Sequence, residues 1–324
     1  MTNFLIRCQR FTRKINGSTI LFLRILKIIS VFVGRNNSSD LKRFTVANRL
    51  PYTKCSSEIY TQVKKRIGLS IVADSKDFDM LILTIPAGIE ALGGYYGGET
   101  KVVVPNRSLE DCRKSLSILE RDDIFVVPEE QCIDDFHRNM LRAKFHNRYG
   151  WALQQFLKVS QVEQTSNDAV LILDADTILI HPRKWFESDS KQILFPSWEF
   201  NPPYYKILSS NTIGSEIPKY TFVTHHMLMQ RNLLLEAMTK FGAENVHDLI
   251  KIIVSKASGE ESAFCIEYEL YGQYLMNYRP ETFFLERWSN RGITRSEISG
   301  LTLKDIRELF PDYASISAHD YIKA

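Results

Sequence analysis

Two hydrophobic patterns follow one another along the chain: short apolar runs, and longer segments in which apolar residues recur at helical spacing. The short runs predict buried strands at residues 80–85, 101–105, 123–128, 170–173, 192–196 and 220–226. The helical spacing predicts helices at residues 108–120, 134–146, 149–162, 232–241, 246–255 and 262–277. Strands that alternate with helices predict an α/β fold with a central, mostly parallel sheet flanked by helices.

The pattern divides the chain into three parts. Residues 1–45 are a basic amphipathic segment, residues 46–75 a connecting helical segment, and residues 76–324 a single α/β domain, because no linker within them is long enough to separate two domains. The glycine-rich stretch at 93–98 lacks the spacing of phosphate-binding motifs, so we expect an ordinary loop there. The prolines at 202–203 are expected to lie in a loop as well.

The N-terminal segment combines charge with a hydrophobic face. Basic residues crowd around the apolar run at 20–33, which contains Arg24 and Lys27. A membrane-spanning helix needs about 20 mostly apolar residues, so this run is too short and too charged to span a bilayer. Two interpretations stay open: a helix that lies on the membrane surface with its basic face toward anionic lipid headgroups, or a helix docked on the protein's own domain.

Composition excludes several classes of protein. The 324 residues are 44% hydrophobic and 24% charged, which is typical of a globular chain. The net charge of +3, without a cluster of basic and aromatic residues, argues against nucleic-acid binding. The five cysteines are scattered and form no C-x-x-C pair, so neither a disulfide framework nor a zinc site is indicated and a reducing, cytoplasmic setting is expected.

Two carboxylates interrupt the end of one buried strand. Asp174 and Asp176 follow the apolar run at 170–173. A carboxylate that is removed from water needs a positive charge or several hydrogen bonds. Hard oxygen ligands of this kind suit Mg²⁺ or Mn²⁺, and in an open α/β sheet ligands bind beyond the carboxyl ends of the strands. The alternative is structural: the two carboxylates cap the next turn or pair with a basic residue such as Arg183.

A metal site next to such a strand fits more than one chemistry. Phosphatases of the haloacid dehalogenase type also carry D-x-D after an apolar strand, with a Thr or Val four residues after the first Asp. Here Thr177 is the third residue and Ile178 the fourth, and the acidic pairs of the chain come before the motif. Both observations argue against the phosphatase. A third interpretation is that the chain keeps the α/β fold of an enzyme but catalyses no reaction and binds a partner instead.

The segment Leu171-Ile-Leu-Asp174-Ala-Asp176-Thr177 resembles the D-x-D region of GT-A-fold glycosyltransferases. Further segments resemble a bacterial group of these enzymes that is linked to cell-surface polysaccharide synthesis: Asn147-Arg-Tyr-Gly-Trp-Ala-Leu-Gln-Gln155, Phe222-Val-Thr-His-His-Met227 and Glu267-Tyr-Glu-Leu-Tyr-Gly272. The resemblance covers roughly residues 78 to 290. It implies a GT-A-like fold, a nucleotide-sugar donor and transfer to a glycan or lipid-linked acceptor.

The resemblance also implies roles for individual residues. Asp174 and Asp176 would hold Mn²⁺ or Mg²⁺ against the donor diphosphate, Asp176 more directly, with Ala175 between them next to the donor. A third metal ligand comes from the C-terminal part of such enzymes, and the candidate is His319. A first strand that ends at Thr84, Ile85 and Pro86 would border the nucleotide base.

One helical face could contact the donor. Arg148, Trp151 and Gln155 are three and four residues apart, so they share a face of the helix before the D-x-D strand, where the guanidinium could bind an oxyanion. The alternative is that Trp151 packs in the core.

Candidates for acceptor binding and proton transfer come later in the chain. Side chains that could contact an acceptor are Trp198, His225, His226 and Tyr271, with Tyr204 and Tyr205 beside Trp198. The two histidines are adjacent, and neighbouring strand residues face opposite sides, so at most one can enter a cleft. An inverting transferase needs a carboxylate base, for which Glu267 is preferred to Glu269, although both could be solvated helix residues. A retaining reaction would not need this base.

These observations together predict a metal-dependent glycosyltransferase of envelope polysaccharide synthesis, located in the cytoplasm at the inner face of the membrane.

Overall fold

The computed structural model describes residues 50–51, 64–197, 199–257 and 264–319. The chain separates into two units, residues 1–46 and 47–324, and the described residues all belong to the second. The predicted basic segment at 1–45 therefore lies outside the described residues. None of the helices among the described residues has the length and apolar character that crossing a membrane requires.

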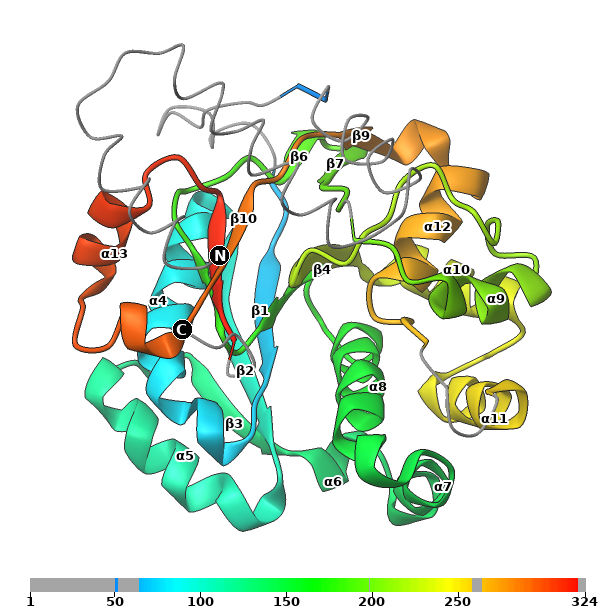
Figure 1. The fold of residues 1–324 in the computed structure, drawn as a ribbon, viewed down its shortest axis with the longest axis horizontal. Helices are drawn as coiled ribbons and strands as arrows, with labels where there is room; N and C mark the ends of the chain where they lie inside the picture. Colours follow the sequence, from blue (N-terminus) through cyan, green and yellow to red (C-terminus); the bar gives the residue numbers. More distant parts are fainter. Residues whose placement is uncertain (1–49, 52–63, 198, 258–263, 320–324) are drawn as a thin grey trace, which may run out of the picture. The chain divides into compact units, whose positions relative to one another are not determined.

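A five-stranded, mostly parallel sheet forms the centre of the described unit, as predicted (Figure 1). Its strands are β1 (Ile67–Val72), β2 (Tyr96–Val104), β3 (Ile124–Pro128), β4 (Ala169–Asp174) and β8 (His226–Gln230). They are ordered β3-β2-β1-β4-β8, with β8 antiparallel to β4 and the other neighbours parallel. The chain builds outward from β1 on one side and then crosses to β4 on the other, so the topological switch lies between β1 and β4.

Helices cover both faces of the sheet (Figure 1). The helices of the described residues are α4 (Phe78–Leu92), α5 (Leu109–Leu116), α6 (Glu129–Cys132), α7 (Asp135–Phe145), α8 (Tyr149–Glu163), α9 (Pro202–Ser210), α10 (Arg231–Phe241), α11 (Val246–Lys256), α12 (Glu269–Tyr278) and α13 (Leu303–Leu309), of which α13 packs on a smaller sheet. Side chains alternate along β4: Val170 and Ile172 pack in the core with α8 and α10, whereas Leu171 and Leu173 pack in the core with α4. Because both faces are buried, the strand reads as a continuous apolar run.

The described residues also form two small sheets. One contains β5 (Thr177–Leu179), β10 (Asn290–Ile293) and β11 (Ser315–Ala318), and the other contains β6 (Phe186–Ser188), β7 (Lys191–Leu194) and β9 (Phe283–Leu285). Strand β11 runs antiparallel to β5, which directly follows the D-x-D pair. This pairing brings the end of the described chain back to the carboxyl edge of β4.

The predicted strand at 80–85 is wrong, because these residues belong to helix α4. Leu81 and Ile85 pack in the core beneath the main sheet, whereas Met80 and Ala87 pack in a second core with Ile178 of β5. A helix that is buried on two sides has little amphipathic periodicity, so its apolar run resembles a buried strand.

The first strand is instead β1, which lies within the segment expected to be helical at 46–75. The prediction is therefore wrong for residues 67–72. The expected strand at 220–226 is also wrong, since β8 begins only at His226. The predicted helix at 262–277 begins at Glu269.

Two predicted loops contain regular structure. Residues 93–98 form a 3-10 turn, Gly93–Tyr95, and the start of β2. The prolines at 202–203 open helix α9, because proline is compatible with the first helical turn, where its missing N–H is not needed.

Candidate active site

A cavity of about 980 Å³ lies at the carboxyl ends of the parallel strands. Ala73 and Asp74 line it after β1, Arg107 after β2, Glu129 after β3, and residues 174–176 after β4. Helices α7 and α8 and the segment 264–268 supply further walls. A large cavity at the topological switch of an α/β sheet is where this class of fold binds its ligands.

Asp176 and His319 meet at this cavity although they are 143 positions apart in the sequence. The Ala318 N–H donates to the backbone carbonyl of Asp176 at 2.8 Å, which extends the β5–β11 pairing and places His319 next to the carboxylate. Nδ1 of His319 lies 3.0 Å from Oδ2 of Asp176, and the two side chains are 10% and 24% exposed. A carboxylate and an imidazole in contact at a cavity wall can act together as ligands of a divalent cation.

Asp174 has three polar partners. Its Oδ1 accepts hydrogen bonds from Lys158 Nζ at 2.6 Å and from the Tyr268 hydroxyl at 2.7 Å. Its Oδ2 lies 3.1 Å from Nδ1 of His225. Burial alone would raise the pKa of Asp174, but the Lys158 ammonium and the His225 hydrogen bond lower it far below its usual range. Asp174 is therefore an anchored, ionised carboxylate, which leaves Asp176 as the more available metal ligand.

Arg183 is not the partner of either carboxylate. Its guanidinium lies 3.8 Å from Glu286 and packs over the ring of Trp288. The example of Arg183 is therefore wrong, but the structural alternative that a carboxylate of the pair contacts a basic residue is confirmed for Asp174. The charge that neutralises Asp174 comes from a residue that the sequence analysis did not single out, Lys158 of helix α8.

Lys158 joins Asp174 to Glu267. The lysine side chain is 2% exposed, and its Nζ lies 3.2 Å from Oε1 of Glu267. Burial would lower the pKa of Lys158, but the two carboxylates raise it. Burial raises the pKa of Glu267 to about 7, which the ammonium only partly offsets. Lys158 therefore compensates the charge of two carboxylates, Asp174 and Glu267. Of these two, Glu267 is the one that takes up a proton near neutral pH.

The two glutamates of the predicted base pair have different surroundings. Glu267 lines the cavity, and among the described residues its buried Oε2 has no hydrogen-bond partner. Glu269 is 0% exposed and accepts hydrogen bonds from the Tyr205 hydroxyl, the Phe222 N–H and the Gln273 amide. Glu269 ties α9, α12 and the segment before β8 together, so the assignment of Glu269 as a catalytic residue is wrong. Neither residue is a solvated helix glutamate.

The two adjacent histidines also separate. His225 lines the cavity with φ of 64°, in the left-handed region that non-glycine residues rarely adopt. His226 is 1% exposed, its Nδ1 contacts the carbonyl of Thr224, and its ring packs on Trp288 away from the cavity. One histidine enters the cleft, as predicted, and the assignment of His226 to acceptor binding is wrong.

The predicted donor-binding face is only partly at the cavity. Trp151 and Gln155 line it. The Gln155 side chain hydrogen-bonds the Phe264 carbonyl and the Ile266 N–H, so it supports the neighbouring wall. Arg148 belongs to a 3-10 turn before α8, is not among the cavity-lining residues, and stacks on Trp151 at 3.9 Å.

Several other predicted site residues lie elsewhere. Thr84, Ile85 and Pro86 are in α4 outside the cavity lining, and the Thr84 hydroxyl donates to the carbonyl of Ala175, which itself lines the cavity. The prediction that they border the nucleotide base at a strand end is therefore wrong. Tyr271 is fully buried and donates to Gln192, so it is not available to an acceptor. Trp198 lies outside the described residues.

Two aromatic residues near Trp198 also differ in their surroundings. Tyr204 lines the cavity, whereas Tyr205 is buried.

Sequence reasoning missed several residues of the cavity. Three arginines, Arg107, Arg138 and Arg142, line the wall formed by the end of β2 and by α7. Lys158 and Tyr268 hold Asp174. The signal for Lys158 was present, because a single lysine interrupts the apolar run Phe156-Leu-Lys-Val159 in a helix that is buried almost throughout. The arginines carried no such signal, since basic residues on helices are usually solvated.

Residues 97–305 match the model of a family described as "Family of unknown function (DUF6492)". The chain belongs to this family. A comparison with curated proteins finds no sequence match. The description of this family names no activity.

Among solved structures, the chain is similar to the mannosyltransferase Ktr4p from S. cerevisiae, with 9% identity and a TM-score of 0.50 over 76% of this chain and 77% of that one. Mouse xyloside xylosyltransferase 1 matches with 11% identity and a TM-score of 0.42 over 81% of this chain and 100% of that one. The WbbM bifunctional glycosyltransferase matches with 10% identity and a TM-score of 0.43 over 84% of this chain and 48% of that one. At 9% identity the similarity to Ktr4p concerns the fold alone, and it agrees with the GT-A-like fold expected from the sequence.

Proposed function

We propose that the protein is a metal-dependent glycosyltransferase that moves a sugar from a nucleotide-sugar donor to a glycan or lipid-linked acceptor. The observation that carries this proposal is the contact of Asp176 with His319, 3.0 Å between Oδ2 and Nδ1, at the wall of a cavity of about 980 Å³. The cavity lies where an α/β sheet of this topology receives its ligand. The likeness of the fold to glycosyltransferases is consistent with the proposal.

The residues present fit a divalent cation. Asp176 and His319 would hold it, and an imidazole next to a carboxylate favours Mn²⁺ over Mg²⁺, which prefers oxygen ligands. Within the part of the chain that the structure describes, no third acidic, histidine or cysteine side chain completes a cluster with this pair. Oxygen atoms of a nucleotide-sugar donor would add further ligands. When bound, such a cation stabilises the negative charge of a departing nucleoside diphosphate.

The protein's own residues prepare the rest of the cavity for an anionic, sugar-bearing ligand. Arg107 and Arg142 line it and supply guanidinium groups, which bind phosphate oxygens in a fixed geometry. Arg138 also lines it but pairs with Glu129, Glu130 and Asp135, so its charge is already engaged. The aromatic rings of Trp151 and Tyr204 offer flat surfaces for a base or a sugar.

Glu267 is placed to handle a proton. In an inverting transfer it would accept the proton of the acceptor hydroxyl through Oε2, while Oε1 stays bound to Lys158. A base works best when its pKa is near the operating pH, and burial raises the pKa of Glu267 to about 7. A retaining transfer would not need this step.

The experiment that tests the proposal is a thermal-shift screen of UDP, GDP, CDP and CMP sugars with and without Mn²⁺. We expect at least one to raise the melting temperature only with Mn²⁺, since a ligand at a hundredfold excess over its Kd stabilises by about 2.7 kcal/mol. Asp176→Ala should abolish the shift, and Asp189→Ala, which removes an exposed aspartate, should retain it. The absence of any shift, together with turnover of p-nitrophenyl phosphate in Mg²⁺, would replace the transferase by a phosphatase.

A glycan or lipid-linked acceptor in bacterial envelope polysaccharide synthesis, and a cytoplasmic location at the inner face of the membrane, are part of the same proposal. They depend on the resemblance in sequence and on the basic segment at 1–45 alone. Deleting residues 1–40 should move the protein from the membrane pellet to the soluble fraction. Unchanged fractionation would remove the membrane proposal without affecting the catalytic one.

A further inference from the structure

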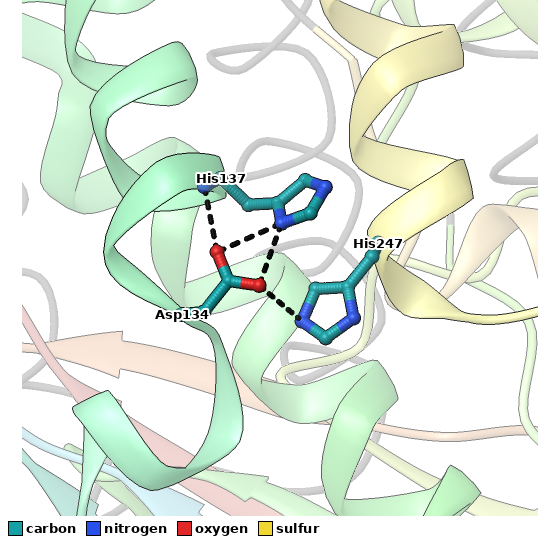
Figure 2. A group of neighbouring side chains, drawn as sticks. All are labelled: Asp134, His137 and His247. Atoms are coloured by element: carbon teal, nitrogen blue, oxygen red, sulfur yellow. Dashed lines mark hydrogen bonds and ion pairs between the residues drawn. The ribbon is translucent and has the colours of Figure 1, made fainter.

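Three metal-ligating side chains converge outside the cavity, where α7 packs against α11 (Figure 2). Asp134 caps the N-terminus of α7, and its Oδ1 accepts the backbone N–H of His137 at 2.9 Å. The Nδ1 atom of His137 lies 2.9 and 3.0 Å from the two Asp134 oxygens. His247, in the first turn of α11, directs its Nε2 at Oδ2 of Asp134 from 3.7 Å.

Helix capping does not account for this arrangement. The cap needs only Asp134 and the His137 N–H, yet two imidazoles also lie against the same carboxylate. The His137 side chain is 9% exposed, and its Nδ1 is the ring nitrogen that faces the group. The shielded Nε2 of His247, which faces Asp134, has no hydrogen-bond partner among the described residues. Buried polar atoms without partners are costly, so they call for a ligand or another explanation.

We propose that Asp134, His137 and His247 bind a zinc ion. Two imidazole nitrogens and one carboxylate oxygen are a typical ligand set for Zn²⁺, unlike the oxygen-rich sets of Mg²⁺ and Ca²⁺. The three ligand atoms lie within 4.8 Å of one another. Zn–ligand bonds of about 2.0–2.2 Å in a tetrahedron place ligand atoms roughly 3.4 Å apart, so the three atoms need to move only slightly.

The arrangement of the two imidazole rings indicates that His247 is the side chain that moves when zinc binds. The two imidazole rings stack at 4.5 Å with 26° between their planes, whereas a bound metal lies in the plane of each ring. His137 is held in the first turn of α7, but the His247 side chain is 36% exposed and can turn its ring out of the stack. Asp134 keeps Oδ1 for the helix cap and offers Oδ2, and solvent on the exposed side of His247 supplies the remaining ligand.

Zinc at this position would tie α7 to α11. Helix α7 also carries Arg138 and Arg142, which line the large cavity, so the tie would hold that wall in place. The inference does not depend on the proposed glycosyltransferase function. It concerns a second metal site that shares no residue with the Asp176–His319 pair.

The test is a titration of the chelator-treated full-length protein with ZnCl2, followed by calorimetry, with Co²⁺ absorption spectra as a second readout. The titration uses the Asp176→Ala variant, so that metal binding at the cavity does not compete with binding at this site. In this background we expect one tightly bound zinc per chain and the visible spectrum of tetrahedral Co²⁺. His247→Ala should weaken binding by at least about tenfold, because even the loss of a residue that only supports a ligand weakens metal sites 10- to 100-fold.

His146→Asn, which changes an exposed histidine elsewhere on the surface, is the matched control and should bind zinc like its parent. Since His247 is half-exposed, its removal should leave the fold intact, which an unchanged far-UV circular dichroism spectrum checks. Equal zinc affinity with and without His247, or zinc binding that disappears with Asp176→Ala alone, would overturn the proposal.

Discussion

Replacing Lys158 by methionine tests the charge arrangement on which the site depends. The ammonium is 2% exposed and lies 2.6 Å from Asp174 and 3.2 Å from Glu267, whose side chains are 22% and 8% exposed. Methionine fills much of the same volume but leaves two carboxylates without a compensating charge. Breaking a buried ion pair by removing one partner costs about 3–5 kcal/mol, and we expect the lower end because Asp174 faces the cavity.

The loss should depend on pH. In the wild type, the lowered pKa of Asp174 contributes stability above the unfolded pKa, which is lost only as the pH falls through the folded value. In Lys158→Met, burial without the ammonium should raise the folded pKa of the carboxyl groups above their unfolded values. Lowering the pH from 8 to 5 then protonates them, so the difference in free energy of unfolding between wild type and variant should shrink.

The assay is urea unfolding followed by far-UV circular dichroism at pH 8, 6.5 and 5. Lys114→Met, at an exposed position of α5, is the matched control and should change the free energy of unfolding by less than about 0.5 kcal/mol. Adding Asp174→Asn to Lys158→Met should recover part of the loss, because it removes one of the uncompensated charges. Wild-type stability of Lys158→Met at every pH would refute the reasoning.

Three further variants separate catalysis from structure. Glu267→Gln should lower kcat by about 10²- to 10⁴-fold. We expect the activity of the wild type to fall as the pH drops through about 7, where Glu267 gains its proton, and the variant should lack this fall. An unchanged pH–rate profile would exclude Glu267 as the base. Glu269→Gln should instead lower the free energy of unfolding, measured by urea unfolding, by about 1–3 kcal/mol, because it disturbs three buried hydrogen bonds. A loss of kcat as large as that of Glu267→Gln would show that Glu269, not only Glu267, acts in catalysis. Gly272→Ala would place a Cβ 2.3 Å from the Phe222 ring. This overpacking should lower the free energy of unfolding by about 1–3 kcal/mol. An unchanged melting temperature would contradict the packing of α12 against Phe222.

The spacing of apolar residues predicts the type and the bounds of an element best where only one face of that element is buried. Helices α7 and α10 have a clear apolar side, and their predicted bounds differ from the observed ones by a residue or two. Strand β4 was recognisable because both of its faces are covered. Helix α4 was mistaken for a strand for the same reason, since burial between two cores removes the polar face that marks a helix.

The candidate site was predictable only in part. The D-x-D doublet is visible because charge interrupts an apolar run, and His319 was implied by resemblance alone. The roles of Glu267 and Glu269 depend on which partners the fold brings to them, Lys158 for one and Tyr205 for the other. Such contacts between residues far apart in the sequence are set by tertiary packing, and no local pattern records them.

The group of Asp134, His137 and His247 also depends on tertiary packing and could not be predicted from the sequence. The spacing of Asp134 and His137 suits a helix cap, and nothing in the sequence connects it to a histidine in α11.

The most direct measurement is anomalous diffraction at the manganese edge from crystals soaked with Mn²⁺ and UDP, GDP or CDP. The account predicts a manganese peak within bonding distance of Asp176 Oδ2 and His319 Nδ1, with diphosphate oxygens completing its coordination inside the cavity. Asp176 and His319 still paired with each other beside an empty cavity, at saturating metal and nucleotide, would contradict it.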